Sequence, residues 1–168
     1  MDLHKEFGQF IPEGKKEEKE NRDVWLYTRV SSKDQFVNKS LCNQQEYGQN
    51  YAHDNNYNLV MQFGATYESA SGDFTRTEFK KLIQSVRKAR QKPFAILIYK
   101  MSRFSRTGGQ AIALATELIE TLGVHLVEVS SGKNTFTERG KLEIYERLLK
   151  AREENIERLE MTVPGMIK

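Results

Sequence analysis

The sequence predicts an α/β domain with a largely parallel central sheet flanked by helices, followed by a long C-terminal helix. Three observations support this fold class. Short apolar runs of strand length alternate with amphipathic helical stretches across residues 24–129, which is the pattern of a parallel sheet. The run at residues 94–99 is continuously apolar, as expected for a strand covered on both faces. From Glu138 the apolar residues recur at alternating steps of three and four, which indicates one long helix.

Composition limits the class of protein. The chain has 168 residues, enough for one domain with a real core. Its net charge of +3 permits a polyanionic partner without demanding one. The single cysteine, Cys42, excludes an internal disulfide and a cysteine-based metal cluster, and fits a reducing compartment. The sequence has no apolar run long enough to span a membrane and no signal peptide, so we expect a cytoplasmic protein without membrane association.

Residues 1–22 are expected to form a mobile charged tail. They contain a dense charge run at residues 13–22 with almost no apolar neighbours. Such a segment cannot bury enough surface to offset the entropy lost on ordering. A short solvated helix within the tail is the alternative.

The first strand is expected at residues 24–27, an apolar run that leads directly to Arg29 and Ser31. Because side chains alternate along an extended chain, these two lie on one face. A guanidinium can hold phosphate oxygens while a serine oxygen reaches phosphorus, so the pair suits attack on a phosphate diester. The alternative is structural, because serine pairs after strands commonly serve as turn or helix-cap residues.

Two helices and a strand are predicted next. A helix opens at Ser40, and a strand at residues 57–67 is expected to end at Glu68. Residues 75–78 have the spacing of a capping box, and the apolar positions beyond them predict a second helix. Arg76 would therefore lie in the first helical turn, where a cation is unfavourable unless an anion binds nearby.

The strand at residues 94–99 runs into a segment that carries Arg103 and Arg106. These arginines are three residues apart, so in a helical turn they face the same way. An amphipathic helix at residues 112–122, followed by a strand at residues 124–129, completes the alternation. Gly123 is expected to stop that helix.

Ligand sites of parallel sheets gather at the carboxyl ends of strands. Those ends carry, in chain order, Arg29 with Ser31, Glu68 with Arg76, and Arg103 with Arg106. The four arginines would form a cationic cradle that stays protonated at any working pH and binds phosphate bidentately. Arginines, like metal ions, can stabilise the charge that develops in phosphoryl transfer. An independent scatter of surface arginines is the alternative.

The three histidines give no sign of a metal site. His4, His53 and His125 are isolated in the sequence, and each is expected on the surface or in packing rather than as a ligand. We therefore expect no metal or other cofactor.

The helix predicted at about residues 138–160 carries a heptad-like stripe. Its members are Leu142, Tyr145, Leu149, Arg152, Ile156 and Leu159. Such a stripe either packs on its own domain, which is the commoner arrangement, or meets a copy of itself. Residues 161–165 are expected to end the helix, and the chain then stops without a finished terminal element, so we expect a fragment.

Taken in order, these motifs resemble those of the serine site-specific recombinases, the resolvase and invertase group. The matching residues are Tyr27-Thr28-Arg29-Val30-Ser31-Ser32, Gln35, Ser40-Leu41 with Gln44, Glu68 before Ala70-Ser71-Gly72, Arg76 with Phe79, and Ser102-Arg103-Phe104-Ser105-Arg106. The resemblance covers about residues 24–160. The separation between Gln35 and Ser40 is more like the large serine recombinases of transposon and phage integrase type.

The resemblance implies a reaction and a role for each residue. Ser31 would attack a DNA phosphate to give a 5′-phosphoserine link and a free 3′-hydroxyl, without metal or nucleotide energy. Arg29, Arg76, Arg103 and Arg106 would bind and activate the phosphate, with Gln35, Gln44 and Glu68 supporting. The family usually has aspartate where this chain has Ser102, which leaves the protonation of the leaving group open.

The resemblance also implies partners and a domain organisation. Double-stranded DNA would be the substrate, and copies of the chain would form a dimer and a tetramer through the long helix, within which strands are exchanged by rotation. Residues 23–136 would be the catalytic domain. Residues 137–168 would hold the long helix and the start of a linker to a separate DNA-binding region.

Two other functions stay open. Glu78-Phe79-Lys80 has the Glu-x-Lys spacing of metal-dependent nucleases, with Asp73 or Glu68 as a further magnesium ligand, but that motif normally lies on a strand and a helix is predicted here. A recombinase-like regulator that keeps the fold without the reaction is favoured by Ser102.

Overall fold

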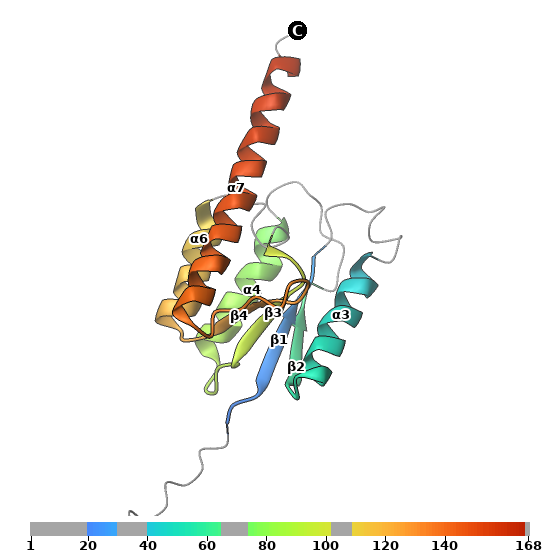
Figure 1. The fold of residues 1–168 in the computed structure, drawn as a ribbon, viewed down its shortest axis with the longest axis vertical. Coiled ribbons are helices and arrows are strands. Elements are labelled where there is room, and N and C mark those ends of the chain that lie inside the picture. The colour runs from blue at the N-terminus through green and yellow to red at the C-terminus, as the bar shows by residue number, and fades with distance from the viewer. Residues whose placement is uncertain (1–19, 30–39, 65–73, 102–108, 167–168) are drawn as a thin grey trace, which may run out of the picture.

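A four-stranded parallel sheet forms the centre of the computed structural model, which describes residues 20–29, 40–64, 74–101 and 109–166 (Figure 1). The strands, in the spatial order β2-β1-β3-β4, are β1 (Asp23–Tyr27), β2 (Asn58–Phe63), β3 (Ala95–Ile98) and β4 (His125–Glu128). All three neighbouring pairs are parallel. The helices are α3 (Ser40–Asp54), α4 (Phe74–Lys88), α6 (Gly109–Thr116) and α7 (Glu138–Met166), with a π-helical turn, η2 (Glu117–Thr121), after α6.

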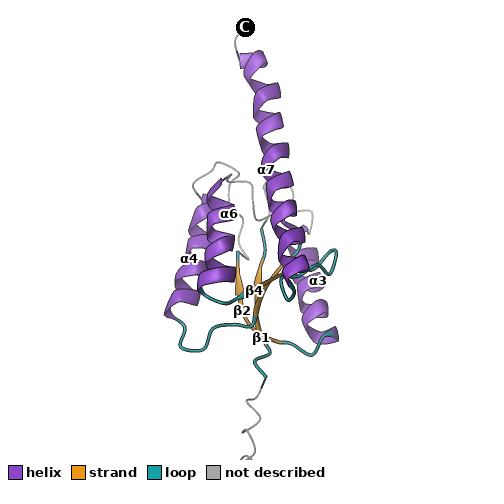
Figure 2. Ribbon diagram, turned by 60° about the vertical axis from the view of Figure 1, so that its left-hand side comes forward, coloured by secondary structure: helices purple, strands orange, loops and turns teal. Residues whose placement is uncertain are grey.

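Helices cover both faces of the sheet, which confirms the predicted fold class (Figure 2). Alternate side chains of each strand enter different cores. The strand residues that pack on the α3 side are Val24, Leu26, Ala95, Leu97 and Val127. Those that pack against α4, α6, η2 and the first half of α7 are Trp25, Tyr27, Ile96, Ile98 and Leu126. None of the helices in the described ranges is long and apolar enough to cross a membrane.

Gly48 lets α3 lie close to β1. A Cβ atom at this position would lie only 2.5 Å from Cδ1 of Leu26. A larger residue would therefore push the helix away from the sheet. The close approach also brings Gln44, one turn earlier on the same face of α3, against the end of β1.

Four element boundaries differ by two or more residues from those the sequence predicts, among them the start of α6, which lies at Gly109 instead of residue 112. β2 ends at Phe63 rather than at residue 67, because Gly64 turns the backbone into the left-handed region with φ of +75°. α4 begins at Phe74, so Thr75 lies inside the first turn rather than at the N-cap. α7 continues to Met166, past the expected end at residues 161–165.

The helix predicted over residues 112–122 forms as α6 followed by η2. The N–H of Leu122 donates to the carbonyl of Glu117, five residues earlier (2.9 Å), so this turn is wider than an α-helical one. The wider turn buries the adjacent residues Leu118 and Ile119 together. Gly123, with φ of +67°, ends it as predicted.

The helix α7 divides its apolar residues between two faces. Ile144 and Leu148 are fully buried in the core of their own domain. Leu142 and Leu149, which are one heptad apart, are 64% and 49% exposed. The predicted stripe thus points away from the domain at these two residues, and the sequence-based interpretation missed the pair that makes the intramolecular contact. The second half of α7 extends beyond the body of the domain (Figure 1).

Candidate active site

The carboxyl end of β1 holds Arg29 in a fixed backbone position. Gln44 of α3 uses both ends of its side-chain amide: its Nε2 donates to the carbonyl of Arg29 (2.8 Å), and its Oε1 accepts the Arg29 N–H (3.1 Å). Both residues are almost completely buried, at 5% exposure for Arg29 and 2% for Gln44. Gln44 thus pairs with the end of β1 as a neighbouring strand would. The contact shows that Gln44 holds the backbone of Arg29, and its supporting role in the reaction stays a prediction.

The residue before Arg29 is fixed from the β2 side. Both the N–H and the hydroxyl of Thr28 donate to the carbonyl of Phe63, at 3.0 and 3.3 Å. Gly64 follows, and a Cβ there would lie 2.0 Å from the Thr28 carbonyl oxygen. The backbone of residues 28 and 29 is therefore held on both sides, by β2 and by α3.

Most of the other predicted site residues lie outside the described residues: Ser31, Gln35, Glu68, Ser102, Arg103 and Arg106. The backbone of Arg76 lies in the first turn of α4, as predicted, and its side chain is outside the description. Met101, two residues before Arg103, is described and is 1% exposed. The convergence of the four arginines stays a prediction.

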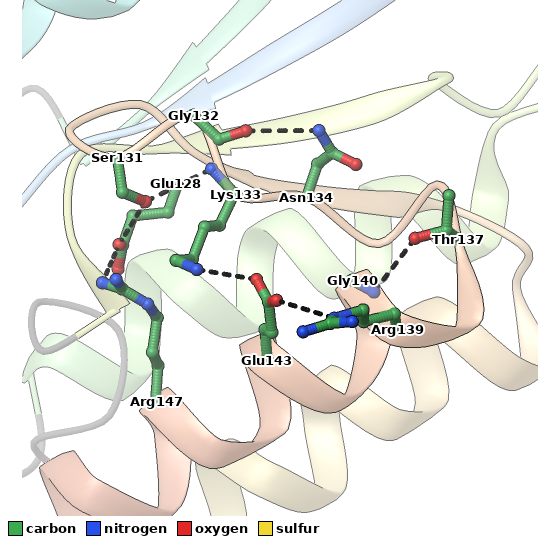
Figure 3. Close-up of polar contacts among 10 residues, drawn as sticks. All are labelled: Glu128, Ser131, Gly132, Lys133, Asn134, Thr137, Arg139, Gly140, Glu143 and Arg147. Carbon is green, nitrogen blue, oxygen red and sulfur yellow. Dashed lines mark hydrogen bonds and ion pairs between the residues drawn. The ribbon is translucent and has the colours of Figure 1, made fainter.

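Glu128, at the carboxyl end of β4, is a buried carboxylate that the sequence-based interpretation missed. Its side chain is 3% exposed and accepts hydrogen bonds from three segments, of which Figure 3 shows those from Ser131 and Arg147. Its Oε2 accepts the N–H of Met101 (2.8 Å), and its Oε1 accepts the hydroxyl of Ser131 (2.7 Å) and Nη1 of Arg147 on α7. The signal in the sequence is a single carboxylate inside the apolar run at residues 124–129.

A basic cleft lies beside this carboxylate. It has a volume of about 280 Å³, and its lining includes Lys100, Met101, Glu128, Arg147 and Lys150. Lys100 follows the end of β3 in the chain, so the cleft is at the same edge of the sheet as Arg29. Cationic side chains at the carboxyl ends of parallel strands suit an anionic ligand.

The histidines that the structure describes are not arranged as ligands. His125 packs between the rings of Phe94 and Phe136, and its Nδ1 lies 3.2 Å from the carbonyl and the hydroxyl oxygens of Thr135. Burial lowers the pKa of His125, against the opposing effect of the Thr135 carbonyl. His53 is exposed beside Asp54. Within the described ranges, no three His, Cys, Asp or Glu side chains are grouped to hold a metal ion.

The Glu-x-Lys motif lies on α4, as the apolar pattern predicts, and not on a strand. Phe79 at its centre is buried and makes an edge-to-face contact with Tyr27 of β1. Lys80 is exposed. The motif therefore lacks the strand context in which the two side chains of a nuclease site would lie on one face.

Comparisons with known proteins agree with this fold. One family model, described as the N-terminal domain of resolvases, matches residues 24–160. A resolvase family site-specific recombinase from Streptococcus pneumoniae has a similar structure, with a TM-score of 0.60 and 21% identity over 87% of this chain and 99% of that one. The N-terminal catalytic domain of TP901-1 integrase gives a TM-score of 0.60 and 20% identity over 82% of this chain and 98% of that one. No curated protein matches the sequence. The family match covers most of the chain. The chain therefore belongs to the resolvase family of recombinases and corresponds to the N-terminal domain of that family.

Proposed function

We propose that this chain is the catalytic domain of a serine site-specific recombinase, of the large type, with Ser31 as the nucleophile. The observation that carries the proposal is the buried position of Arg29 at the end of β1. Two hydrogen bonds with the side-chain amide of Gln44 hold its backbone there. An arginine removed from water attracts a phosphate oxygen more strongly than one in solvent, because the surroundings are less polarisable. Ser31 follows two residues later in the sequence.

In the proposed reaction the oxygen of Ser31 forms a bond to phosphorus while the bond from phosphorus to the 3′-oxygen of the DNA breaks. The serine loses its proton, and the departing 3′-oxygen gains one. One phosphate ester replaces another, so the reaction can reverse without an external source of energy. Arg29, Arg76, Arg103 and Arg106 would neutralise the charge on the phosphate oxygens, with Gln35, Gln44 and Glu68 supporting.

The test is covalent capture of DNA by the protein as its gene encodes it. A cognate site with a nick that traps the cleaved state is incubated with protein in excess EDTA, and the product is separated on a denaturing gel. We expect an adduct that maps to Ser31 by mass spectrometry and is lost in Ser31→Ala, while DNA binding survives. Ser32→Ala is the matched control, and it should still form the adduct.

Three results would overturn the assignment. An adduct that persists in Ser31→Ala, or that maps to Ser32 or Ser102, would show another nucleophile. An absolute requirement for magnesium would favour the nuclease, and DNA binding without any adduct would favour the recombinase-like regulator. Of these two alternative functions, the nuclease has the weaker support, because Glu78-Phe79-Lys80 lies on α4 and not on a strand.

We also propose that α7 is a self-association surface, through the exposed pair Leu142 and Leu149. Two large apolar side chains one heptad apart on an exposed face suit a second helix. Leu149→Lys should lower the association seen by sedimentation without unfolding the domain. Glu146→Lys, an exposed change on the same helix, is the control, and equal sedimentation of both variants and wild type would count against the surface.

A further inference from the structure

The buried carboxylate of Glu128 binds the turn that follows its own strand and two segments that are distant in the chain. Met101 donates its backbone N–H to Oε2. Ser131 and Arg147 both donate to Oε1 (Figure 3). Met101 is also fixed by its side chain, which lies in the same core as Ile144 and Leu148 of α7. The residue from which the chain continues toward Arg103 is thus attached to β4 and to α7.

The charge of Glu128 needs a partner. A carboxylate that is almost excluded from water costs several kcal/mol unless a cation and hydrogen bonds compensate it. Ser131 and the Met101 N–H are neutral donors, whereas Arg147 supplies a positive charge. Without Arg147, the carboxylate would be more stable in contact with solvent than in its buried position. It would then turn outward and no longer accept the Met101 N–H.

We propose that Glu128 and Arg147 are positioning residues for the proposed reaction, which hold the backbone at Met101, two residues before Arg103 in the sequence. The inference rests on the proposed function, because it assigns these two residues a part in the same reaction. It also makes the site depend on α7, since Arg147 lies on that helix, between the exposed residues Leu142 and Leu149. A partner that moves α7 would act on Met101 through Arg147.

A second ion pair in the same region provides a matched control. Lys133, in the turn after β4, binds Glu143 of α7 at 2.7 Å (Figure 3). This pair also joins the turn to α7, four residues before Arg147, but the Met101 N–H donates to Glu128 and not to Glu143. A variant that breaks it weakens the attachment of α7 and leaves the bond to Met101 intact.

The experiment compares Arg147→Gln, Arg147→Lys and Glu143→Gln in the protein as its gene encodes it. Amide hydrogen exchange at Met101 reports the backbone directly, and the rate of covalent adduct formation with the nicked site under single-turnover conditions reports the reaction. We expect Arg147→Gln to speed exchange at Met101 and to slow adduct formation, each by about tenfold, since a hydrogen bond to a charged group is lost. The adduct rate is measured at saturating DNA, because Arg147 also lines the basic cleft and its loss would lower DNA affinity as well. Arg147→Lys, which keeps the charge, should bring the exchange rate at Met101 and the rate of adduct formation close to the wild-type values. Glu143→Gln should change neither rate.

The two readouts separate the failure of this inference from that of the proposed function. Unchanged exchange at Met101 in Arg147→Gln would overturn the inference whatever the activity. Faster exchange with an unchanged adduct rate, or equal slowing by Glu143→Gln, would overturn the positioning role while the proposed function stands. A wild-type protein that forms no adduct would overturn the proposed function, and the catalytic part of the inference with it.

Discussion

The carboxyl ends of β1 and β4 hold the backbone at the same edge of the sheet in different ways. At β1, the neutral side chain of Gln44 makes both a donor and an acceptor bond to Arg29. At β4, the carboxylate of Glu128 accepts one backbone N–H and depends on Arg147 for charge compensation. Gln44 binds a single residue at the end of β1, whereas Glu128 joins the backbone at Met101, a turn and a long helix.

Because of this difference, the two strand ends should respond differently to salt and to a movement of α7. The side-chain amide of Gln44 completes the hydrogen bonding of β1 and carries no charge, so this contact depends neither on salt nor on the position of α7. An ion pair in a buried site is strong only while both charges are in place. We therefore regard the β1 end as a fixed part of the site and the β4 end as the part that α7 can alter.

The largest expected effect is on the free energy of unfolding when a glycine with left-handed backbone is replaced by alanine. One such glycine follows β2 beside the end of β1, and another lies in the turn after β4. Gly64 has φ of +75°, and a Cβ would lie 2.0 Å from the carbonyl oxygen of Thr28; Gly132, after β4, has φ of +73° and open space around it. Gly132→Ala should lower the free energy of unfolding by about 1 kcal/mol, the cost of that backbone conformation. Gly64→Ala should lower it by about 3 kcal/mol or more, because Thr28 must move as well. Urea denaturation measures both, and equal losses would show that the β1 end is not held tightly.

A smaller effect is expected from Gln44→Glu, which keeps the shape and removes the donor. The new carboxylate would face the carbonyl of Arg29, where Nε2 now donates at 2.8 Å. An unsatisfied buried acceptor costs about 2 kcal/mol, and an ionised one costs more. Gln49→Glu, on the exposed side of α3, is the control and should be near neutral. If both variants unfold at the same urea concentration, the two hydrogen bonds between the Gln44 side chain and the Arg29 backbone do not stabilise the β1 end.

The elements of this fold could be predicted because each depends on local pattern. The continuous apolar run at residues 94–99 and the helical spacing from Phe79 to Val86 are visible without any partner, and both formed as β3 and α4. The family resemblance implied a supporting role for Gln44, but its contact with Arg29 was not predicted. The contact joins residues 15 apart in the chain, which no periodicity reveals.

Features that depend on distant contacts were missed. Glu128 differs from its apolar neighbours in sequence, but its role requires Met101 and Arg147, which are 27 and 19 residues away. The heptad spacing selected Leu142 and Leu149, while Ile144 and Leu148 pack into the core because of where β4 delivers α7. The early end of β2 at Phe63 results from one glycine, whose φ cannot be read from an apolar run.

The smallest expected effect is a difference in acid response between the two ends. A hydrogen bond and the charge of Lys133, the two largest causes, together with Arg139 hold the pKa of Glu143 below its ordinary value of 4.5. A carboxyl group with a lowered pKa in the folded state stabilises that state above its ordinary pKa, and the contribution is lost as the pH falls through the lowered value. The attachment of α7 to the turn after β4 should therefore loosen in acid. The contact of Gln44 with Arg29 is made by an amide side chain and the backbone, which do not titrate in this range.

Nuclear magnetic resonance can follow both ends in one pH titration. The carboxyl carbon of Glu143 should titrate below the ordinary value in wild type and return toward it in Lys133→Gln, since the bond to Lys133 is the largest cause. The protection factor of the Arg29 amide should stay constant over the same pH range in both proteins. Both residues are in one chain, so a general acid unfolding would lower the protection of Arg29 at the pH where Glu143 titrates. That outcome would show that the two ends loosen together, and the distinction between a fixed β1 end and an adjustable β4 end would be lost.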